Sequence, residues 1–320
     1  MYLDTTYTNG VIAVKEKSLL KDKIFRLCEV SVDEAFRMLL ESGFGGAVTD
    51  NVYEYEKLLT AETASLDEFI RIYAPSQAMQ AYFLLPRDFH NAKAFVKAKC
   101  LGESADKMLA PSGMFSVEDI QLCVMENAYA KVDAVPELVK ACKESTMLLE
   151  TDVNGADIGS IFEKCLYEAL VRVVKKNRAL RELLSAKIDM TNVLTALRSG
   201  DENVAETQYL SGGKLSKKRV LALCTGDLEK MRLQFGEEWK EFISLCLDAK
   251  EKGVPFTQAE KYRDGHDVIS LEKRKFELVK GEPFLYYVYS KKADIANVRI
   301  VLACLMAGLD EMQIKNRLRK

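Results

Sequence analysis

The chain has 320 residues, of which 48% are hydrophobic and 29% charged, and its formal net charge is −2. A chain of this length and composition is not disordered as a whole, and it can form two or three domains with buried cores. The small negative charge argues against nucleic acid as the main partner.

Hydrophobic periodicity predicts helices along almost the whole chain. A serine followed three residues later by a carboxylate predicts helix starts at Ser31 and Ser116, and Pro136 fits the first turn of another helix. The apolar residues of Ile161–Leu184 recur on one side, which predicts a single long amphipathic helix. Runs that alternate like a strand are few, so we do not expect a sheet.

Glycine and proline predict the turns between these helices, and no stretch resembles a long flexible linker. The expected turns lie at Gly43–Gly46, Pro75, Pro86, Pro111–Gly113, Gly212-Gly213 and Gly265. The first residues carry no basic or apolar stretch typical of a signal peptide. The longest uncharged apolar stretch, Ile300–Leu309, is about half of the ~20 residues that a helix needs to span a bilayer. We therefore expect no segment to enter a membrane on its own.

A short pattern, Asp-x-x-Asn, recurs three times at nearly even intervals of about a hundred residues, and each copy precedes a helix-like apolar run. A period of this length suits a small helical domain better than a solenoid repeat. We therefore predict three similar helical domains, at residues 1–105, 106–205 and 206–320. The three copies of the pattern are Asp88 with Asn91, Asp189 with Asn192, and Asp294 with Asn297.

About twenty residues beyond each of the first two asparagines, a leucine precedes a glycine turn and then a serine. These segments are Leu109–Ser116 and Leu210–Ser216. The residues two positions after the three asparagines differ, being Lys93, Leu194 and Arg299, so no shared catalytic position is visible.

An aspartate at a helix start accepts backbone N–H groups and favours the positive end of the helix dipole. We therefore interpret the three aspartates as helix caps. In the alternative interpretation, the three asparagines form hydrogen bonds across packed helices and fix the orientation of equivalent units.

No motif predicts a metal site, a cofactor or a catalytic centre. The eight cysteines are scattered without a C-x-x-C pair, which indicates reduced core residues of a cytosolic protein. Gly212–Ser216 lacks the first glycine and the hydroxyl residue of a phosphate-binding loop. The two histidines, His90 and His266, have no neighbours at metal-ligand spacing.

The C-terminal part of the chain contains, in order, Glu282–Tyr287, Lys291 and Lys292, Asp294, Asn297–Arg299 and Gly308-Leu309. Together with the segments Ile188–Arg198 and Asp88–Lys97, this series resembles the C subunit of the V-type ATP synthases, the family of the eukaryotic V-ATPase d subunit. The length and the spacing of the motifs fit over essentially the whole chain.

Three departures from the family pattern indicate a divergent member. Cys304 and Leu305 lie where a lysine is expected before the Gly308-Leu309 turn. Tyr167 replaces a frequent aspartate, and the segment Asn9–Ile12 lacks the usual arginine.

The resemblance implies an all-α protein of three similar helical domains, arranged with pseudo-threefold symmetry as a funnel with a central cavity. It implies a non-catalytic rotor part of a rotary ATPase, in the central stalk and peripheral on the cytoplasmic face of the membrane. Its partners would be the D and F subunits of the central shaft and the membrane rotor ring, and it would support ATP synthesis or ATP-driven transport of hydrogen or other ions. It implies no cofactor, no small-molecule substrate and no nucleic acid.

The residues that contact these partners are not identified by the sequence. Phe44, Phe284, Tyr286 and Tyr287 are candidates for burying partner side chains, with an ordinary core position as the alternative. Two other classes of function stay open at this point. One is a helical-repeat scaffold or adaptor unrelated to a rotary motor, and the other is an enzyme that uses scattered carboxylates in a helical cavity.

Overall fold

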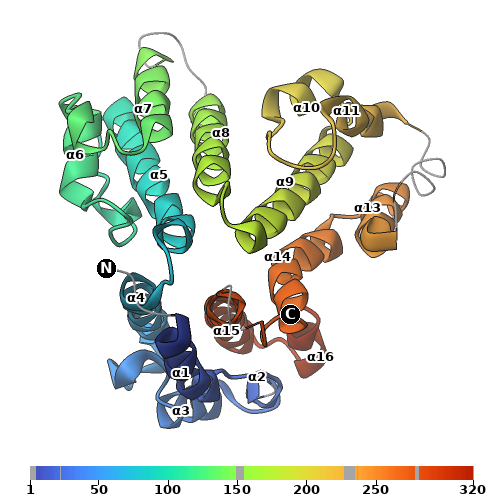
Figure 1. Cartoon of the computed structure of the whole chain (residues 1–320). Coiled ribbons are helices and arrows are strands. Elements are labelled where there is room, and N and C mark those ends of the chain that lie inside the picture. The colour runs from blue at the N-terminus through green and yellow to red at the C-terminus, as the bar shows by residue number, and fades with distance from the viewer. Residues whose placement is uncertain are drawn as a thin grey trace. The chain divides into compact units, whose positions relative to one another are not determined.

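The computed structural model describes residues 5–21, 23–148, 155–226, 235, 237–277 and 281–319. In this part of the chain all regular secondary structure is helical and no strand occurs, so the predicted all-α class is confirmed. The chain divides into two compact units, one formed by Met1–Ser76 with Glu260–Lys320 and the other by Gln77–Ala259 (Figure 1).

The first unit combines helices from both ends of the sequence. They are α1 (Thr5–Lys15), α2 (Lys23–Leu27), α3 (Val32–Glu41), α4 (Tyr55–Tyr73), α15 (Glu282–Met306) and α16 (Glu311–Lys315). The long helix α15 packs against each of the others in this group. The core between α4 and α15 includes Phe69, whose ring centroid lies 5.8 Å from that of Phe284 and 4.7 Å from that of Tyr287.

The second unit is built on two long helices, α5 (Gln77–Leu101) and α9 (Arg178–Ser199). Its other helices are α6 (Val117–Met125), α7 (Pro136–Leu148), α8 (Gly155–Val174), α10 (Glu202–Gln208), α11 (Lys217–Thr225) and α13 (Lys240–Lys252). Helix α5 packs against α6, α7 and α8, and α9 packs against α8, α10, α11 and α13. Helix α14 (Thr257–Glu272) begins in this unit and continues into the first.

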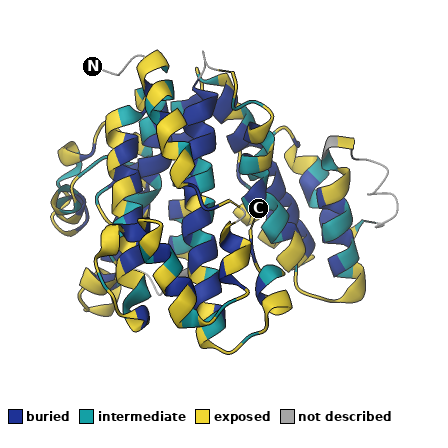
Figure 2. Cartoon of the chain, turned by 90° about the horizontal axis from the view of Figure 1, so that it is seen from below, coloured by how far each residue is buried: buried dark blue, intermediate teal, exposed yellow. Residues whose placement is uncertain are grey.

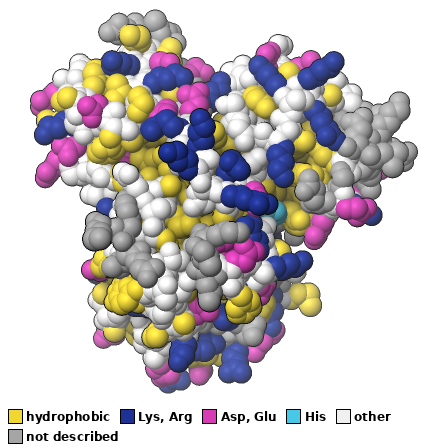
Figure 3. Space-filling model, in the orientation of Figure 1, with side chains coloured by type: hydrophobic (Ala, Val, Ile, Leu, Met, Phe, Trp, Pro, Cys, Tyr) yellow, Lys and Arg dark blue, Asp and Glu magenta, His cyan; other side chains and the backbone are white. Residues whose placement is uncertain are grey.

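Several helices, such as α3 and α4, are amphipathic, and buried and exposed residues lie on different sides of helices in Figure 2. Acidic and basic side chains are interspersed on the face seen in Figure 3, as expected of solvated helix surfaces. Seven of the eight cysteines are buried in these cores, whereas Cys100 is exposed. Within the described ranges, no helix has both the length and the apolarity required to cross a membrane.

The predicted helix starts are confirmed. The side chain of Ser31 accepts a hydrogen bond of 3.3 Å from the backbone N–H of Glu34, and that of Ser116 accepts one of 3.0 Å from Asp119. Pro136 is the first residue of α7, where its missing N–H removes no helical hydrogen bond.

The single helix predicted over Ile161–Leu184 is wrong, because two helices divide this stretch. Helix α8 ends at Val174, and Asn177 caps α9 by accepting a 3.0 Å hydrogen bond from the N–H of Leu180. Residues 175–178 are all polar, so no apolar side chain is available to pack for most of a turn. The chain therefore ends α8 here and starts α9 with the asparagine cap, instead of continuing one helix.

Two predicted turns are also wrong, since Pro86 lies inside α5 and Gly265 inside α14. Both residues are poor helix formers, and their local preference suggested a break. Helix α5 buries more than half of its residues, and this tertiary packing offsets the local cost of its proline.

Candidate functional site

The first Asp-x-x-Asn pair lies in the middle of α5 and holds the segment that leads into α6. Asp88 accepts hydrogen bonds of 2.7 Å from the N–H of Met114 and 3.2 Å from that of Phe115. Asn91 donates to the carbonyl of Ala110 at 3.1 Å and accepts from the N–H of the same residue at 2.8 Å. Asp88 and Asn91 are almost completely buried. We call such an Asp–Asn pair, with the backbone that it binds, a clamp.

The second pair forms the same clamp on α9. Asp189 accepts hydrogen bonds of 2.8 Å from the N–H of Lys214 and 3.0 Å from that of Leu215. Asn192 and Leu210 exchange two hydrogen bonds, of 2.8 and 2.9 Å, between amide and backbone. These four hydrogen bonds of the second clamp thus correspond to the four described for the first, although the flanking sequences differ.

A glycine is required in each of these two clamps because the carboxylate approaches the backbone closely. A Cβ atom built on Gly113 would lie 2.3 Å from an Asp88 carboxylate oxygen, and one built on Gly213 would lie 2.0 Å from that of Asp189. Both distances are far inside van der Waals contact. The glycine turn noted in the sequence is therefore part of the clamp.

The third pair, on α15, binds backbone from both ends of the chain. Asn297 exchanges two hydrogen bonds with Arg319, its side-chain amide donating at 2.9 Å and its oxygen accepting at 2.8 Å. Asp294 accepts a 2.9 Å hydrogen bond from the N–H of Leu20, between α1 and α2. This clamp therefore joins sequence-distant segments within the first unit.

The interpretation of the three aspartates as caps of their own helices is wrong, because all three lie well inside α5, α9 and α15. An aspartate and an asparagine three residues apart lie on one helix face. Both side chains therefore point at the same side of the helix. The asparagines do bond across to packed segments, and each does so within its own unit.

Arg299 lies on α15 outside the third clamp. Its guanidinium makes two hydrogen bonds to the carboxylate of Glu56, of 3.0 and 2.8 Å. Both side chains are more than half exposed, so this pair contributes little to stability.

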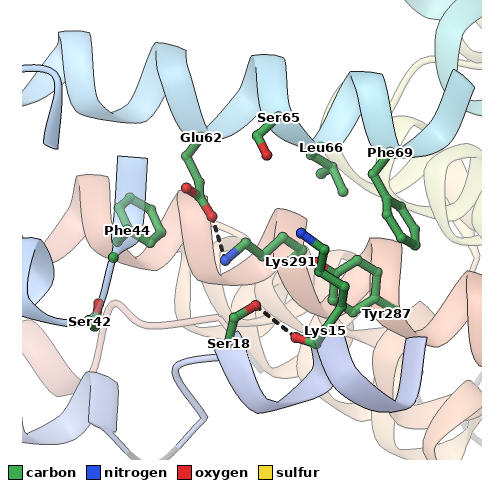
Figure 4. A pocket seen from close by; sticks show the side chains of 11 residues that line it. Lys15, Ser18, Ser42, Phe44, Glu62, Ser65, Leu66, Phe69, Tyr287 and Lys291 are labelled. Atoms are coloured by element: carbon green, nitrogen blue, oxygen red, sulfur yellow. Dashed lines mark hydrogen bonds and ion pairs between the residues drawn. The ribbon is translucent and has the colours of Figure 1, made fainter. Parts of the chain in front are cut away.

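A buried ion pair lies beside the third clamp, and sequence analysis did not identify it. Lys291 of α15 contacts Glu62 of α4, and the Glu62 carboxylate also accepts a 2.7 Å hydrogen bond from the N–H of Gly45. Lys291 precedes Asp294 by one helical turn, but nothing in the local sequence identifies Glu62 as its partner. The pair lines a cavity of about 150 Å³ into which Lys15 also points (Figure 4).

The buried position of Asp294 changes its acidity. Burial raises the pKa of its carboxyl to about 6, against the opposing effects of the Leu20 hydrogen bond and of Lys291. The neighbouring Glu62 carboxylate raises this pKa further, and Lys21 lowers it.

The four aromatic candidates for partner contacts are all core residues. Phe44, Phe284, Tyr286 and Tyr287 are buried within the first unit. Their rings contribute to packing there, as in the contact of Tyr287 with Phe69.

Each of the two histidines lies beside a polar group, His266 having a ring nitrogen 3.3 Å from the hydroxyl of Ser270 on the same helix. His90 hydrogen-bonds the carbonyl oxygen of Met108 at 2.8 Å, beside an open groove of about 580 Å³ that Lys93 and Lys164 also line. Burial lowers the pKa of His266. No group of three His, Cys, Asp or Glu side chains in the described ranges is placed to hold a metal ion.

Comparison with known proteins agrees with the resemblance. A sequence model of the ATP synthase (C/AC39) subunit matches residues 8–317. The chain is 20% identical to the C subunit of the V-type sodium ATPase of Enterococcus hirae, over 95% of this chain and 92% of that protein. It is 26% identical to the C subunit of the V-type ATP synthase of Thermus thermophilus, over 70% and 72% of the two chains. It is 23% identical to the C subunit of the A-type ATP synthase of Methanosarcina acetivorans, over 96% and 90%.

Proposed function

Because the chain belongs to the ATP synthase (C/AC39) subunit family and is thus part of a rotary ATPase, we propose that it is a non-catalytic rotor part. In this role it is a socket that couples the central shaft, made of the D and F subunits, to the membrane rotor ring. The coupling serves ATP-driven ion transport or ATP synthesis. The observation that carries the proposal is the family match, which extends over residues 8–317.

The clamps support a mechanical role. A part that transmits torque must resist bending where its helices connect, and connections are usually the most mobile elements of a fold. Here buried carboxylates hold two such connections through hydrogen bonds to Met114 and Phe115 and to Lys214 and Leu215. The clamps therefore restrain connections between helices that would otherwise be the most mobile segments of the fold.

The proposal includes three similar helical domains, at residues 1–105, 106–205 and 206–320, around a pseudo-threefold axis and a central cavity. Asp88, Asp189 and Asp294, with their asparagines, would occupy equivalent positions in them. The similar bonding of the three clamps supports this equivalence. The protein would lie on the cytoplasmic face of the membrane, attached through the ring.

The proposal is tested by mixing the purified chain with a purified D–F heterodimer and measuring mass by gel filtration with light scattering. We expect a stable complex of one chain with one heterodimer. An unrelated helical protein of similar mass, mixed with the same heterodimer, is the control and should elute separately.

If no complex forms, the experiment is repeated with membranes that contain the rotor ring, and binding is measured by sedimentation. Absence of binding in both experiments would refute the socket and favour a scaffold unrelated to a rotary motor.

A further inference from the structure

Two buried thiols of the second unit lie in contact. Cys123 of α6 and Cys142 of α7 have their sulfur atoms 3.9 Å apart, and each side chain is 1% exposed. Both helices pack against α5 and against each other, so the two thiols are held together by the core. Among the cysteines of the chain, all of which the structure describes, no other pair makes such a contact.

The two thiols titrate as a pair, because each can donate a hydrogen bond to the thiolate of the other. The hydrogen bond that Cys142 can donate to a Cys123 thiolate lowers the pKa of Cys123, although burial opposes this. The same hydrogen bond and burial raise the pKa of Cys142. The thiolate is the form of cysteine that reacts with oxidants, so Cys123 is the thiol expected to react first.

We propose that Cys123 and Cys142 form a reversible redox site that closes to a disulfide between α6 and α7. The oxidant is a small neutral peroxide, which can enter when the nine-residue helix α6 opens locally. The Cys123 sulfur attacks one peroxide oxygen, the O–O bond breaks, and a sulfenic acid and one water form. The Cys142 sulfur then attacks the sulfenic sulfur, and a second water leaves as the S–S bond forms. Hydrogen peroxide is reduced to two water molecules, and the two thiols lose their hydrogens.

The position of the pair indicates what the disulfide would change. Helix α6 begins just after Met114 and Phe115, which the first clamp holds, and Cys123 lies near its other end. With the disulfide closed, α6 is fixed at its start by the clamp and near its end by a covalent bond to α7. Oxidation would thus add a covalent restraint to a helix that the first clamp already holds at its start. This inference does not depend on the proposed rotor function.

The test uses the full chain in its native state. It is exposed to hydrogen peroxide, denatured, treated with a maleimide that labels the remaining thiols, and mapped by mass spectrometry of peptides. We expect a linked peptide pair containing Cys123 and Cys142 that disappears after reduction, and a higher melting temperature for the oxidised protein.

Matched variants make the outcome specific. Cys123→Ala should abolish the linked pair and leave Cys142 open to labelling. Cys142→Ala should also abolish it, and should leave Cys123 oxidised to a sulfenic acid that the maleimide does not label. Cys246→Ala, at a buried cysteine without a thiol contact, should leave the linked pair intact. If a variant does not fold, the peptide map of the wild-type chain still decides.

Two results would overturn the proposal. In one, Cys123 and Cys142 are still fully labelled after exposures that oxidise the exposed Cys100. In the other, Cys142 is linked to Cys165, which lies near enough to affect its titration, and not to Cys123.

Discussion

At the scale of single residues, each clamp depends on a buried carboxylate that accepts hydrogen bonds from backbone N–H groups. A buried donor without a partner costs about 1–3 kcal/mol, whereas an ordinary hydrogen bond contributes about 0.5–1.5 kcal/mol net. The clamp aspartates are therefore predicted to be much more sensitive to substitution than aspartates that bind backbone at the surface.

The substitution Asp189→Asn tests this difference. An asparagine side chain would turn an NH₂ group toward one of the two donors, Lys214 or Leu215, and leave it unpaired. We expect the free energy of unfolding, measured in urea, to fall by about 1–3 kcal/mol. Asp201→Asn is the control, because Asp201 accepts backbone N–H groups at the exposed start of α10, where asparagine caps equally well. Equal losses in both variants would contradict the clamp.

The clamp glycines give a second prediction. Gly213→Ala places a Cβ atom 2.0 Å from the Asp189 carboxylate. It should destabilise the protein by about 1–3 kcal/mol, because the Asp189 side chain and the backbone that it binds must move apart. Gly159→Ala, inside α8 with no atom within 4 Å of the new Cβ, should stabilise by about 0.5–1 kcal/mol. Thermal melting of the two variants compares them directly, and a stable Gly213→Ala protein would show that the close approach is not needed.

The raised pKa of Asp294 predicts a dependence of stability on pH. Because burial raises this pKa from 3.8 to about 6, the folded state binds the proton more tightly than the unfolded state does. Protonation of Asp294 thus stabilises the fold below about pH 4, and this contribution is lost as the pH rises through 6. The charged neighbours Lys291, Glu62 and Lys21 act on this equilibrium and are present in both proteins compared below.

The variant Asp294→Asn lacks this titration. Relative to the wild type, it should gain stability as the pH rises from 4 to 6, by up to about 3 kcal/mol for a shift of this size, and then level off. Urea unfolding of both proteins at several pH values measures the difference. If the difference in free energy of unfolding between the two proteins is constant from about pH 4 to pH 7, the carboxyl of Asp294 has an ordinary pKa.

At the scale of elements, the clamps predict slow hydrogen exchange in segments that are not helical. The amides of Met114 and Phe115, and those of Lys214 and Leu215, should exchange as slowly as amides inside neighbouring helices. In Asp189→Asn, protection should disappear at Lys214 and Leu215 and persist at the other two, which serve as an internal control. Fast exchange at all four in the wild type would show that the clamps do not hold these segments.

The comparison of sequence and structure is also clearest at this scale. The helices and the serine caps at Ser31 and Ser116 could be predicted, because periodicity and capping are local. The place of Asp88 within α5 could not be predicted, since aspartate inside a helix is locally unfavourable and becomes favourable only through its bonds to Met114 and Phe115. The pair of Glu62 with Lys291 joins residues far apart in sequence, and one sequence contains no signal for such a contact.

At the scale of the whole molecule, the chain is organised by contacts between its two ends. Asp294 binds Leu20, and α15 packs against α1, α2, α3 and α4, so the first unit requires both ends of the chain. The three-domain division at 105/106 and 205/206 stays a prediction. The first clamp joins residues on both sides of position 105, and the second joins residues on both sides of position 205.

The central claim is that this protein couples a shaft to a membrane ring, and the most direct test measures ion uptake per ATP hydrolysed. Vesicles carry the rotary ATPase reconstituted with or without this chain. With the chain present, we predict that ATP hydrolysis drives ion uptake into the vesicles. Without it, uptake should be abolished while the soluble motor still hydrolyses ATP. Equal uptake per ATP hydrolysed in the two preparations would contradict the socket.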